Sequence, residues 1–236
     1  MNGSITIQQP EGPAQQLFLL FHGYGASPQG LAPLGQRLGA AFPHSLVVSV
    51  QAPSACDLGR GFQWFSAQGI TEENRLDRIT KAMPAFSDCI AHWQKHSKLD
   101  AARTALIGFS QGAIMALAST QSPPMQAGRV VALAGRFAVL PDAVPPECTL
   151  HFVHGKQDAV IPYGFTIEAA ERLVALGCDI TADVLPFVGH EVNAEVESLV
   201  LNRLQTHLPK RYWDAAEKAQ AAETLQVTTN TPLSRG

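Results

Sequence analysis

The chain has 236 residues, of which 46% are hydrophobic and 16% are charged. This composition is typical of one globular α/β domain and excludes a largely disordered protein. The formal net charge is −3, and the lysines and arginines are scattered along the chain, which argues against nucleic-acid binding.

No stretch approaches the ~20 consecutive apolar residues that span a bilayer, and the first residues lack the basic and then apolar pattern of a signal peptide. We therefore expect a cytoplasmic protein that does not associate with membranes. The four cysteines have no spacing of the zinc-site kind, so we expect no zinc site and reduced structural thiols.

Short apolar runs alternate with stretches of helical composition along the chain. The runs with the length of buried strands are Leu17 to Phe21, Leu46 to Val50, Thr104 to Phe109, Val130 to Leu133, Thr149 to Val153 and Ile180 to Leu185. The stretches with the length of crossover helices are Leu31 to Ala41, Asp77 to Lys95, Gly112 to Thr120 and Thr166 to Leu176. This alternation predicts an α/β fold with a mostly parallel, twisted sheet and helices on both faces.

The composition changes near residue 209. An Ala/Glu/Lys/Gln segment from Trp213 to Ala222 is followed by a polar end. We expect residues 1–208 to form the α/β domain, and residues 209–236 to form a peripheral helix and a flexible tail.

The strongest candidate for a reactive residue is Ser110. It lies in Gly108-Phe109-Ser110-Gln111-Gly112, directly after an apolar run and before a helical pattern. This is the G-x-S-x-G turn that presents a nucleophilic serine between a strand and a helix. The alternative is an ordinary glycine-rich turn with a capping serine.

A serine nucleophile needs a base, and histidine titrates near neutrality. His190 follows the apolar run that ends at Leu185, and Asp158 follows the run that ends at Val153. Both therefore belong to loops at strand ends, in the chain order Ser, Asp, His that this kind of hydrolase uses. The alternatives are a surface-loop histidine and a turn aspartate.

Acyl transfer also needs donors for the oxygen that becomes negative. The backbone N–H groups of Gln111 and of Tyr24, in His22-Gly23-Tyr24-Gly25, are the candidates; a simple tight turn is the alternative for Tyr24. The long connection from residue 51 to 71 contains Phe62 and Trp64, which we consider as substrate-binding residues of an apolar acyl pocket or, equally, as part of a flap over the core.

Together these residues resemble the phospholipase/carboxylesterase family, which includes acyl-protein thioesterases and small bacterial carboxylesterases. The resemblance covers about residues 15 to 208. It rests on four ordered motifs, which are Phe21-His22-Gly23-Tyr24-Gly25, Gly108-Phe109-Ser110-Gln111-Gly112, His154-Gly155-Lys156-Gln157-Asp158 and Gly189-His190. It implies an α/β-hydrolase fold and a Ser-Asp-His esterase of short acyl esters, without metal or cofactor; some members of the family cleave thioesters or form dimers.

The sequence departs from this family at three positions. Relatives usually carry Leu at the position of Tyr24, often Asp at that of Ala26, and commonly Gly at that of Ala113. A larger side chain at Tyr24, beside the acyl site, argues against transferring the protein-thioesterase activity to this chain, whereas backbone donation from residue 24 is unaffected.

The prediction is a serine carboxylesterase that acts on a small-molecule ester through Ser110, His190 and Asp158, with a homodimer left open. Two alternatives remain at this point. One is a thioesterase or peptidase that uses the same three residues. The other is a non-catalytic binding protein on a hydrolase scaffold, because a fold alone does not fix a function.

Overall fold

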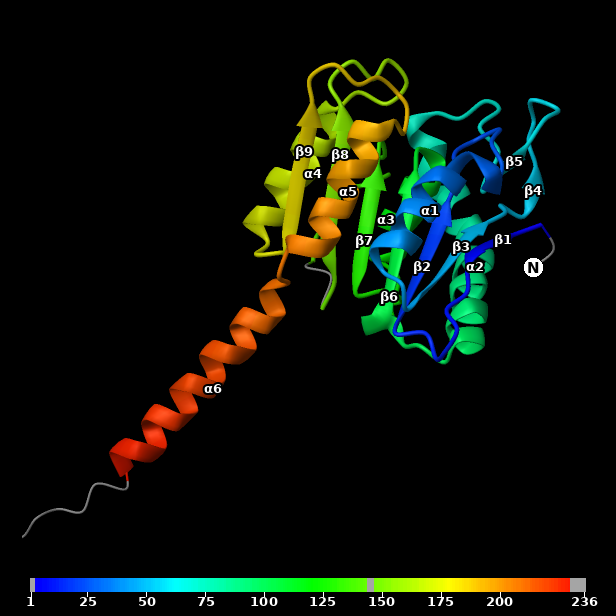
Figure 1. Cartoon of the computed structure of the whole chain (residues 1–236). Coiled ribbons are helices and arrows are strands. Elements are labelled where there is room, and N and C mark those ends of the chain that lie inside the picture. The colour runs from blue at the N-terminus through cyan, green and yellow to red at the C-terminus, as the bar shows by residue number, and fades with distance from the viewer. Residues whose placement is uncertain (1–2, 144–146, 230–236) are drawn as a thin grey trace, which may run out of the picture.

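The structure is a computed structural model that describes residues 3–143 and 147–229 (Figure 1). Its main sheet contains β1 (Ile5–Gln8), β2 (Gln16–Phe21), β3 (Ser45–Val50), β6 (Thr104–Phe109), β7 (Arg129–Leu133), β8 (Thr149–Gly155) and β9 (Ile180–Leu185). The seven strands lie in the order β1-β3-β2-β6-β7-β8-β9. All neighbours pair in parallel except β1, which pairs antiparallel with β3 at one edge.

Each of the six predicted strands is confirmed to within two residues at either end. The strand that the sequence pattern did not reveal is β1. It is four residues long and half-exposed, and it ends in a register irregularity. An edge strand of this kind lacks the apolar run that marks a buried strand.

Helices cover both faces of the sheet (Figure 1). One face carries α1 (Ala32–Ala41) and α5 (Ala194–Thr206), and the other carries α2 (Glu72–Ser97), α3 (Gln111–Ser119) and α4 (Gly164–Ala175). Short 3-10 turns lie at Pro28–Leu31 and Ala101–Arg103. The predicted α/β fold with a mostly parallel sheet is therefore confirmed.

The alternation of side chains along β2 divides the core into two layers. Leu17, Leu19 and Phe21 pack toward α2 and α3, whereas Phe18 and Leu20 pack toward α1 and α5. Successive side chains of a strand point to opposite faces, so a continuous apolar run supplies both layers. Each such side chain that is fully buried contributes ~1.5–3 kcal/mol of transfer free energy.

The start of α2 differs from the prediction. We expected α2 to begin at Asp77, but it begins at Glu72. Its N-terminus is set by a reciprocal pair of hydrogen bonds in which Asn74 N–H donates to Thr71 Oγ1 and Thr71 N–H donates to Asn74 Oδ1. This capping arrangement satisfies backbone donors that the helix leaves free.

The connection between β3 and α2 folds back along the carboxyl ends of the strands. It contains a small antiparallel hairpin of β4 (Ser54–Ala55) and β5 (Phe62–Gln63). Phe62 N–H donates to Ala26 O and Gly25 N–H donates to Phe62 O, at 2.8 and 3.0 Å. The connection is therefore attached to the loop that follows β2.

The C-terminal helix α6 (Lys210–Thr229) is longer than the expected Trp213 to Ala222 and projects from the body of the protein (Figure 1). Asp179 accepts a hydrogen bond from Lys210 N–H at 3.0 Å and so fixes the start of this helix. The division at residue 209 stays a prediction, and the tail predicted to be flexible lies, from residue 230 onward, outside the described residues.

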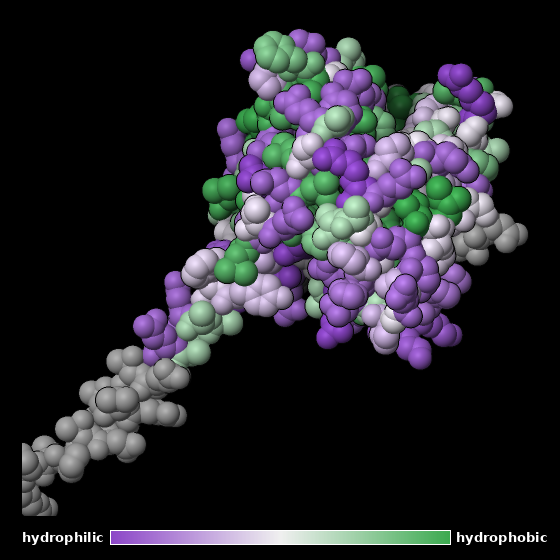
Figure 2. Space-filling model, viewed as in Figure 1, coloured by the Kyte–Doolittle hydropathy of each residue, from purple (hydrophilic) through white to green (hydrophobic). Residues whose placement is uncertain are grey.

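The surface around α1 and α5 is mainly polar, with apolar side chains in small separate patches (Figure 2). Among the described residues, no helix combines the length and the apolar composition that crossing a bilayer requires.

Candidate active site

Three loops at the carboxyl edge of the sheet bring Ser110, His190 and Asp158 together. Ser110 directly follows β6, Asp158 follows β8, and His190 follows β9. His190 Nε2 lies 2.9 Å from Ser110 Oγ, and His190 Nδ1 lies 2.7 Å from Asp158 Oδ2. A carboxylate only accepts, so Nδ1 carries the proton and Nε2 is the acceptor for the serine hydroxyl.

The turn at Ser110 holds its backbone in a strained conformation. Its φ is 54° and its ψ is −116°, a region that residues with a Cβ seldom adopt. The flanking glycines are needed for space, because a Cβ at Gly108 would collide with the backbone of Gly112 and Ala113, and one at Gly112 would collide with Phe21 O. The G-x-S-x-G spacing therefore reflects close backbone packing around the serine.

The strained turn is anchored to the neighbouring strand. Ser110 N–H donates to Leu133 O, at the end of β7, at 2.9 Å. Ser110 is also the residue before α3, so its side chain lies at the helix N-terminus, where the helix dipole favours negative charge.

Asp158 is held by donors on both of its oxygens. Oδ1 accepts the backbone N–H groups of Val160 and Ile161 at 2.8 and 2.9 Å, and Oδ2 accepts from His190. Burial raises the pKa of Asp158, whereas the hydrogen bonds from His190, Ile161 and Val160 lower it. The hydrogen bonds together outweigh burial, so the pKa lies below its ordinary value. Asp158 is therefore an ionised, fixed partner for His190.

The ring of Phe109 packs against the ring of His190. The two ring centroids are 4.9 Å apart, at an interplanar angle of 38°. The loop that carries His190 is attached to the Asp158 loop, because Gln157 N–H donates to Val188 O at 2.9 Å. The imidazole is thus confined between a carboxylate and an aromatic ring.

The two predicted oxyanion donors lie in the loop after β2 and at the start of α3. Within residues 3–143 and 147–229, neither Tyr24 N–H nor Gln111 N–H donates a hydrogen bond. The loop of Tyr24 lies against the serine, since a Cβ added at Gly23 would stand 3.2 Å from Ser110 Cβ. Their part as oxyanion donors stays a prediction.

Comparisons with known proteins agree with this arrangement. The sequence pattern of the phospholipase/carboxylesterase family matches residues 2–208. The chain belongs to this family. It is 43% identical over 212 residues to esterase YpfH of Escherichia coli strain K12, covering 90% of this chain and 91% of that one.

One further relative and one solved structure are similar to this carboxylesterase. Acyl-protein thioesterase 1 of Saccharomyces cerevisiae is 28% identical over 196 residues, covering 72% of this chain and 82% of that one. The crystal structure of esterase PE8 superposes with a TM-score of 0.78 at 27% identity, covering 87% of this chain and 99% of that one. The predicted α/β-hydrolase fold and the esterase class are thereby confirmed.

The side chain of Gln111 makes two hydrogen bonds in this carboxylesterase that its sequence did not reveal. Its Oε1 accepts from Trp64 N–H at 2.8 Å, and its Nε2 donates to Phe65 O at 2.7 Å. The glutamine beside the serine therefore fixes the connection that contains Trp64. The sequence held no signal for these contacts, because the partners are 47 and 46 positions away from Gln111.

His22 and Trp64 fix the loop of Tyr24. Trp64 Nε1–H donates to His22 O at 3.1 Å. His22 Nδ1–H donates to Gly23 O at 2.8 Å, and His22 Nε2 accepts from Ala52 N–H at 3.1 Å. Burial lowers the pKa of His22, against the hydrogen bond to Gly23 that raises it, so the ring is neutral and supports the loop without adding charge.

Trp64 and Phe62, the two predicted substrate-binding residues, contact the core and the loop after β2. Trp64 is 4% exposed and packs against Phe21 and Phe86 in the core. Phe62 is half-buried and pairs through its backbone with the loop after β2. These contacts describe the flap over the core; a direct contact of either side chain with substrate stays a prediction.

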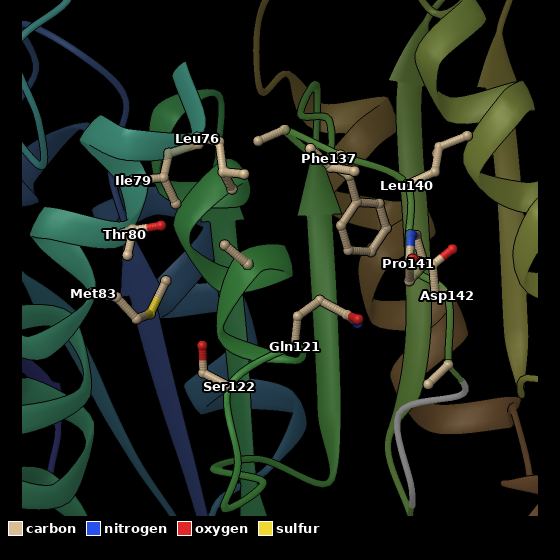
Figure 3. Close-up of a pocket in the computed structure, with 14 residues that line it drawn as sticks. Leu76, Ile79, Thr80, Met83, Gln121, Ser122, Phe137, Leu140, Pro141 and Asp142 are labelled. Atoms are coloured by element: carbon tan, nitrogen blue, oxygen red, sulfur yellow. The ribbon is translucent and has the colours of Figure 1, made fainter. Parts of the chain in front are cut away.

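An apolar pocket of about 410 Å³ lies between α2, α3 and the segment after β7. Figure 3 shows it running from Leu76 and Phe137, near the strand ends, to Gln121 and Ser122. The exposed apolar side chains of Leu76, Val139 and Leu140 line it. The pocket is therefore mainly apolar, and one end of it lies near the carboxyl ends of the strands.

An ion pair joins two of the segments that line this pocket, α2 and the segment after β7. Arg136, next to Phe137, donates from Nη1 and Nη2 to both carboxylate oxygens of Glu72, one turn before Leu76, at 3.1 and 2.8 Å. The guanidinium also stacks on the ring of Phe165, 3.6 Å from its centroid. Sequence reasoning missed this pair, because its partners are 64 positions apart.

Proposed function

We propose that this carboxylesterase hydrolyses short-chain acyl esters through a Ser110-His190-Asp158 triad and an acyl-enzyme. The observation that carries the proposal is the continuous chain of two hydrogen bonds, 2.9 Å from serine to imidazole and 2.7 Å from imidazole to carboxylate. Hydrolysis by a serine nucleophile requires a base within hydrogen-bonding distance of the serine and an acid that orients the base.

The first half-reaction acylates the serine. His190 Nε2 takes the hydroxyl proton while Ser110 Oγ attacks the ester carbonyl, and Asp158 stabilises the imidazolium without taking the proton. The carbonyl oxygen becomes negative and binds the N–H groups of Tyr24 and Gln111, each of which lowers the barrier by ~3 kcal/mol. The imidazolium then protonates the alkoxide, which leaves as the alcohol.

The second half-reaction restores the enzyme. Water enters the place of the alcohol, His190 takes one of its protons, and the oxygen attacks the acyl carbonyl. The same two backbone donors bind the second oxyanion. Collapse breaks the bond to Ser110 Oγ, which regains its proton from His190, and the carboxylic acid departs.

The ion pair of Arg136 and Glu72 supports the preference for short acyl chains. It joins α2 to the segment after β7, and both of these line the apolar pocket. The guanidinium of Arg136 is 9% exposed, and a buried charge beside this pocket disfavours a long apolar chain there.

A thioester is the second candidate substrate, because a relative named acyl-protein thioesterase 1 matches 72% of this chain. The same triad and oxyanion donors serve either carbonyl. Matched oxygen and sulfur esters of one acyl group, compared by kcat/KM, separate the two, since preference is a difference of transition-state free energies.

The test is hydrolysis of p-nitrophenyl esters of graded acyl length by the wild type and by Ser110→Ala. Ser119→Ala is the matched control, because Ser119 is a buried serine at the other end of α3. We expect short acyl esters to be cleaved fastest and kcat of Ser110→Ala to fall by at least ~10³-fold, with Ser119→Ala close to wild type. Wild-type rates in folded Ser110→Ala would refute the proposal.

A further inference from the structure

His154, in β8, is a second histidine beside Asp158. Its Nε2 lies 3.2 Å from Asp158 Oδ2, and both side chains are completely shielded from solvent. The same carboxylate oxygen accepts from His190. The mechanism above gives this histidine no task, although it is in direct contact with the acid.

The hydrogen bonds of His154 indicate which of its ring nitrogens carries the proton. Its Nε2 lies 2.7 Å from Ile161 O, and its Nδ1 lies 2.8 Å from Thr166 Oγ1. A carbonyl oxygen only accepts, so Nε2 carries a proton, and the hydroxyl of Thr166 then donates to Nδ1. Burial lowers the pKa of His154, against Ile161 O and Asp158 that raise it, so the ring is neutral.

We propose that His154 is a positioning residue of the esterase reaction, whose Nε2–H is shared between Ile161 O and Asp158 Oδ2 and holds the carboxylate that orients His190. The inference rests on the proposed triad and adds a member to it. His154 touches neither the serine nor the substrate, and it acts only through Asp158.

The shared proton completes the coordination of the carboxylate. Oδ1 accepts from Val160 and Ile161, Oδ2 accepts from His190, and His154 Nε2 lies 3.2 Å from Oδ2. A carboxylate has about four acceptor positions, so the shared proton of His154 fills the fourth. The carboxylate cannot rotate without losing donors, which fixes the direction in which it presents Oδ2 to the imidazole.

A donor on the carboxylate also tunes its basicity. The polar groups that face Asp158 are His190, His154 and the amides of Val160 and Ile161; those that face His154 are Asp158, Ile161 O, Thr166 of α4 and, at longer range, His190. Removal of the His154 donor makes the carboxylate more basic. It then stabilises the imidazolium of His190 more, so the base is protonated at higher pH.

Two polar variants of similar size separate this role from a structural one. In His154→Gln the amide nitrogen falls near the position of Nε2 and keeps the donor; in His154→Asn the amide falls near Nδ1 and the donor to Asp158 is lost. His151→Asn is the control, because His151 is equally buried in the same strand but bonds to Thr181 instead.

The measurement is kcat and KM for a short-chain p-nitrophenyl ester between pH 5 and pH 9. For His154→Asn we expect kcat to fall about tenfold, a part of the ~10²–10⁴-fold that a positioned base contributes, with KM unchanged. We also expect the acidic limb of kcat/KM to move to higher pH. His154→Gln and His151→Asn are expected to keep the wild-type limb.

The proposal is overturned if His154→Asn and His154→Gln share one pH profile, or if both lose activity only in proportion to their folded fraction. These results would leave the wild-type esterase and the proposed triad intact. If instead the wild type and Ser110→Ala hydrolyse the ester at equal rates, the proposed function itself fails.

Discussion

The side-chain amide of Gln111 holds the backbone of Trp64 at 2.8 Å, and through it the connection that covers the edge of the sheet. Because the N–H of the same Gln111 is a proposed oxyanion donor, one residue links the reacting carbonyl to the flap beside it. The indole of Trp64 continues this link to His22 O, in the loop of the other donor.

The first prediction concerns this link. Gln111→Met keeps the backbone N–H and nearly the volume, but it leaves Trp64 N–H and Phe65 O without partners. Each buried group left unpaired costs about 1–3 kcal/mol of unfolding free energy. Urea unfolding measures the loss, with Gln121→Met beyond the other end of α3 as the control. A stability equal to wild type would show that these hydrogen bonds do not hold the flap.

The second prediction concerns the space around the serine. Gly112→Ala places a Cβ against the carbonyl oxygens of Phe21 and His22, which belong to the sheet and the oxyanion loop. Such overpacking costs about 1–3 kcal/mol or more, so we expect a lower Tm and lost activity. Gly164→Ala is the matched control, because its Cβ would meet nothing within 4 Å. An unchanged Tm for Gly112→Ala would contradict the close approach.

The third prediction concerns pH. Burial, with contributions from His207 and Arg129, lowers the pKa of His151 from 6.5 to about 3. The unfolded chain therefore binds this proton first, so stability is fully present above pH 6.5 and is lost as the pH falls toward 3. Urea midpoints measured from pH 7 to pH 4 should decline in wild type and decline less in His151→Asn. Equal slopes for the two proteins would exclude His151 as a source of the loss.

The fourth prediction concerns acyl length. Arg136→Met removes the guanidinium next to Phe137, which lines the apolar pocket, whereas Arg75→Met breaks only the neighbouring ion pair with Glu72. An apolar pocket discriminates by about 1–3 kcal/mol per methylene, so Arg136→Met should raise kcat/KM for longer acyl esters relative to short ones. Arg75→Met should leave the profile unchanged. The same length profile in both variants would remove the ion pair from the account of specificity.

The sequence predicted the sheet well because parallel strands that are buried on both faces have continuous apolar sequences, such as Leu17 to Phe21. The G-x-S-x-G turn and the order of Ser110, Asp158 and His190 likewise pointed to one edge of the sheet. The structure brings these three side chains together, and their catalytic roles remain the proposal.

The supporting contacts were beyond sequence reasoning for a physical reason. Gln111 to Trp64 and Arg136 to Glu72 join residues 47 and 64 positions apart, so no local period encodes them. His154 was visible only as a histidine in a strand, and its contact with Asp158 depends on how the loop from residue 156 to 163 turns back. Strand β1 was missed because a short, half-exposed edge strand has no apolar run.

The most direct test of the central claim is the mass of the protein after reaction with a fluorophosphonate, followed by peptide mapping. We expect one adduct per chain, on Ser110, absent in Ser110→Ala and formed far more slowly in His190→Ala, because the hydroxyl then lacks its base. Folded wild-type protein that carries no adduct, or carries it on another serine, would contradict the account.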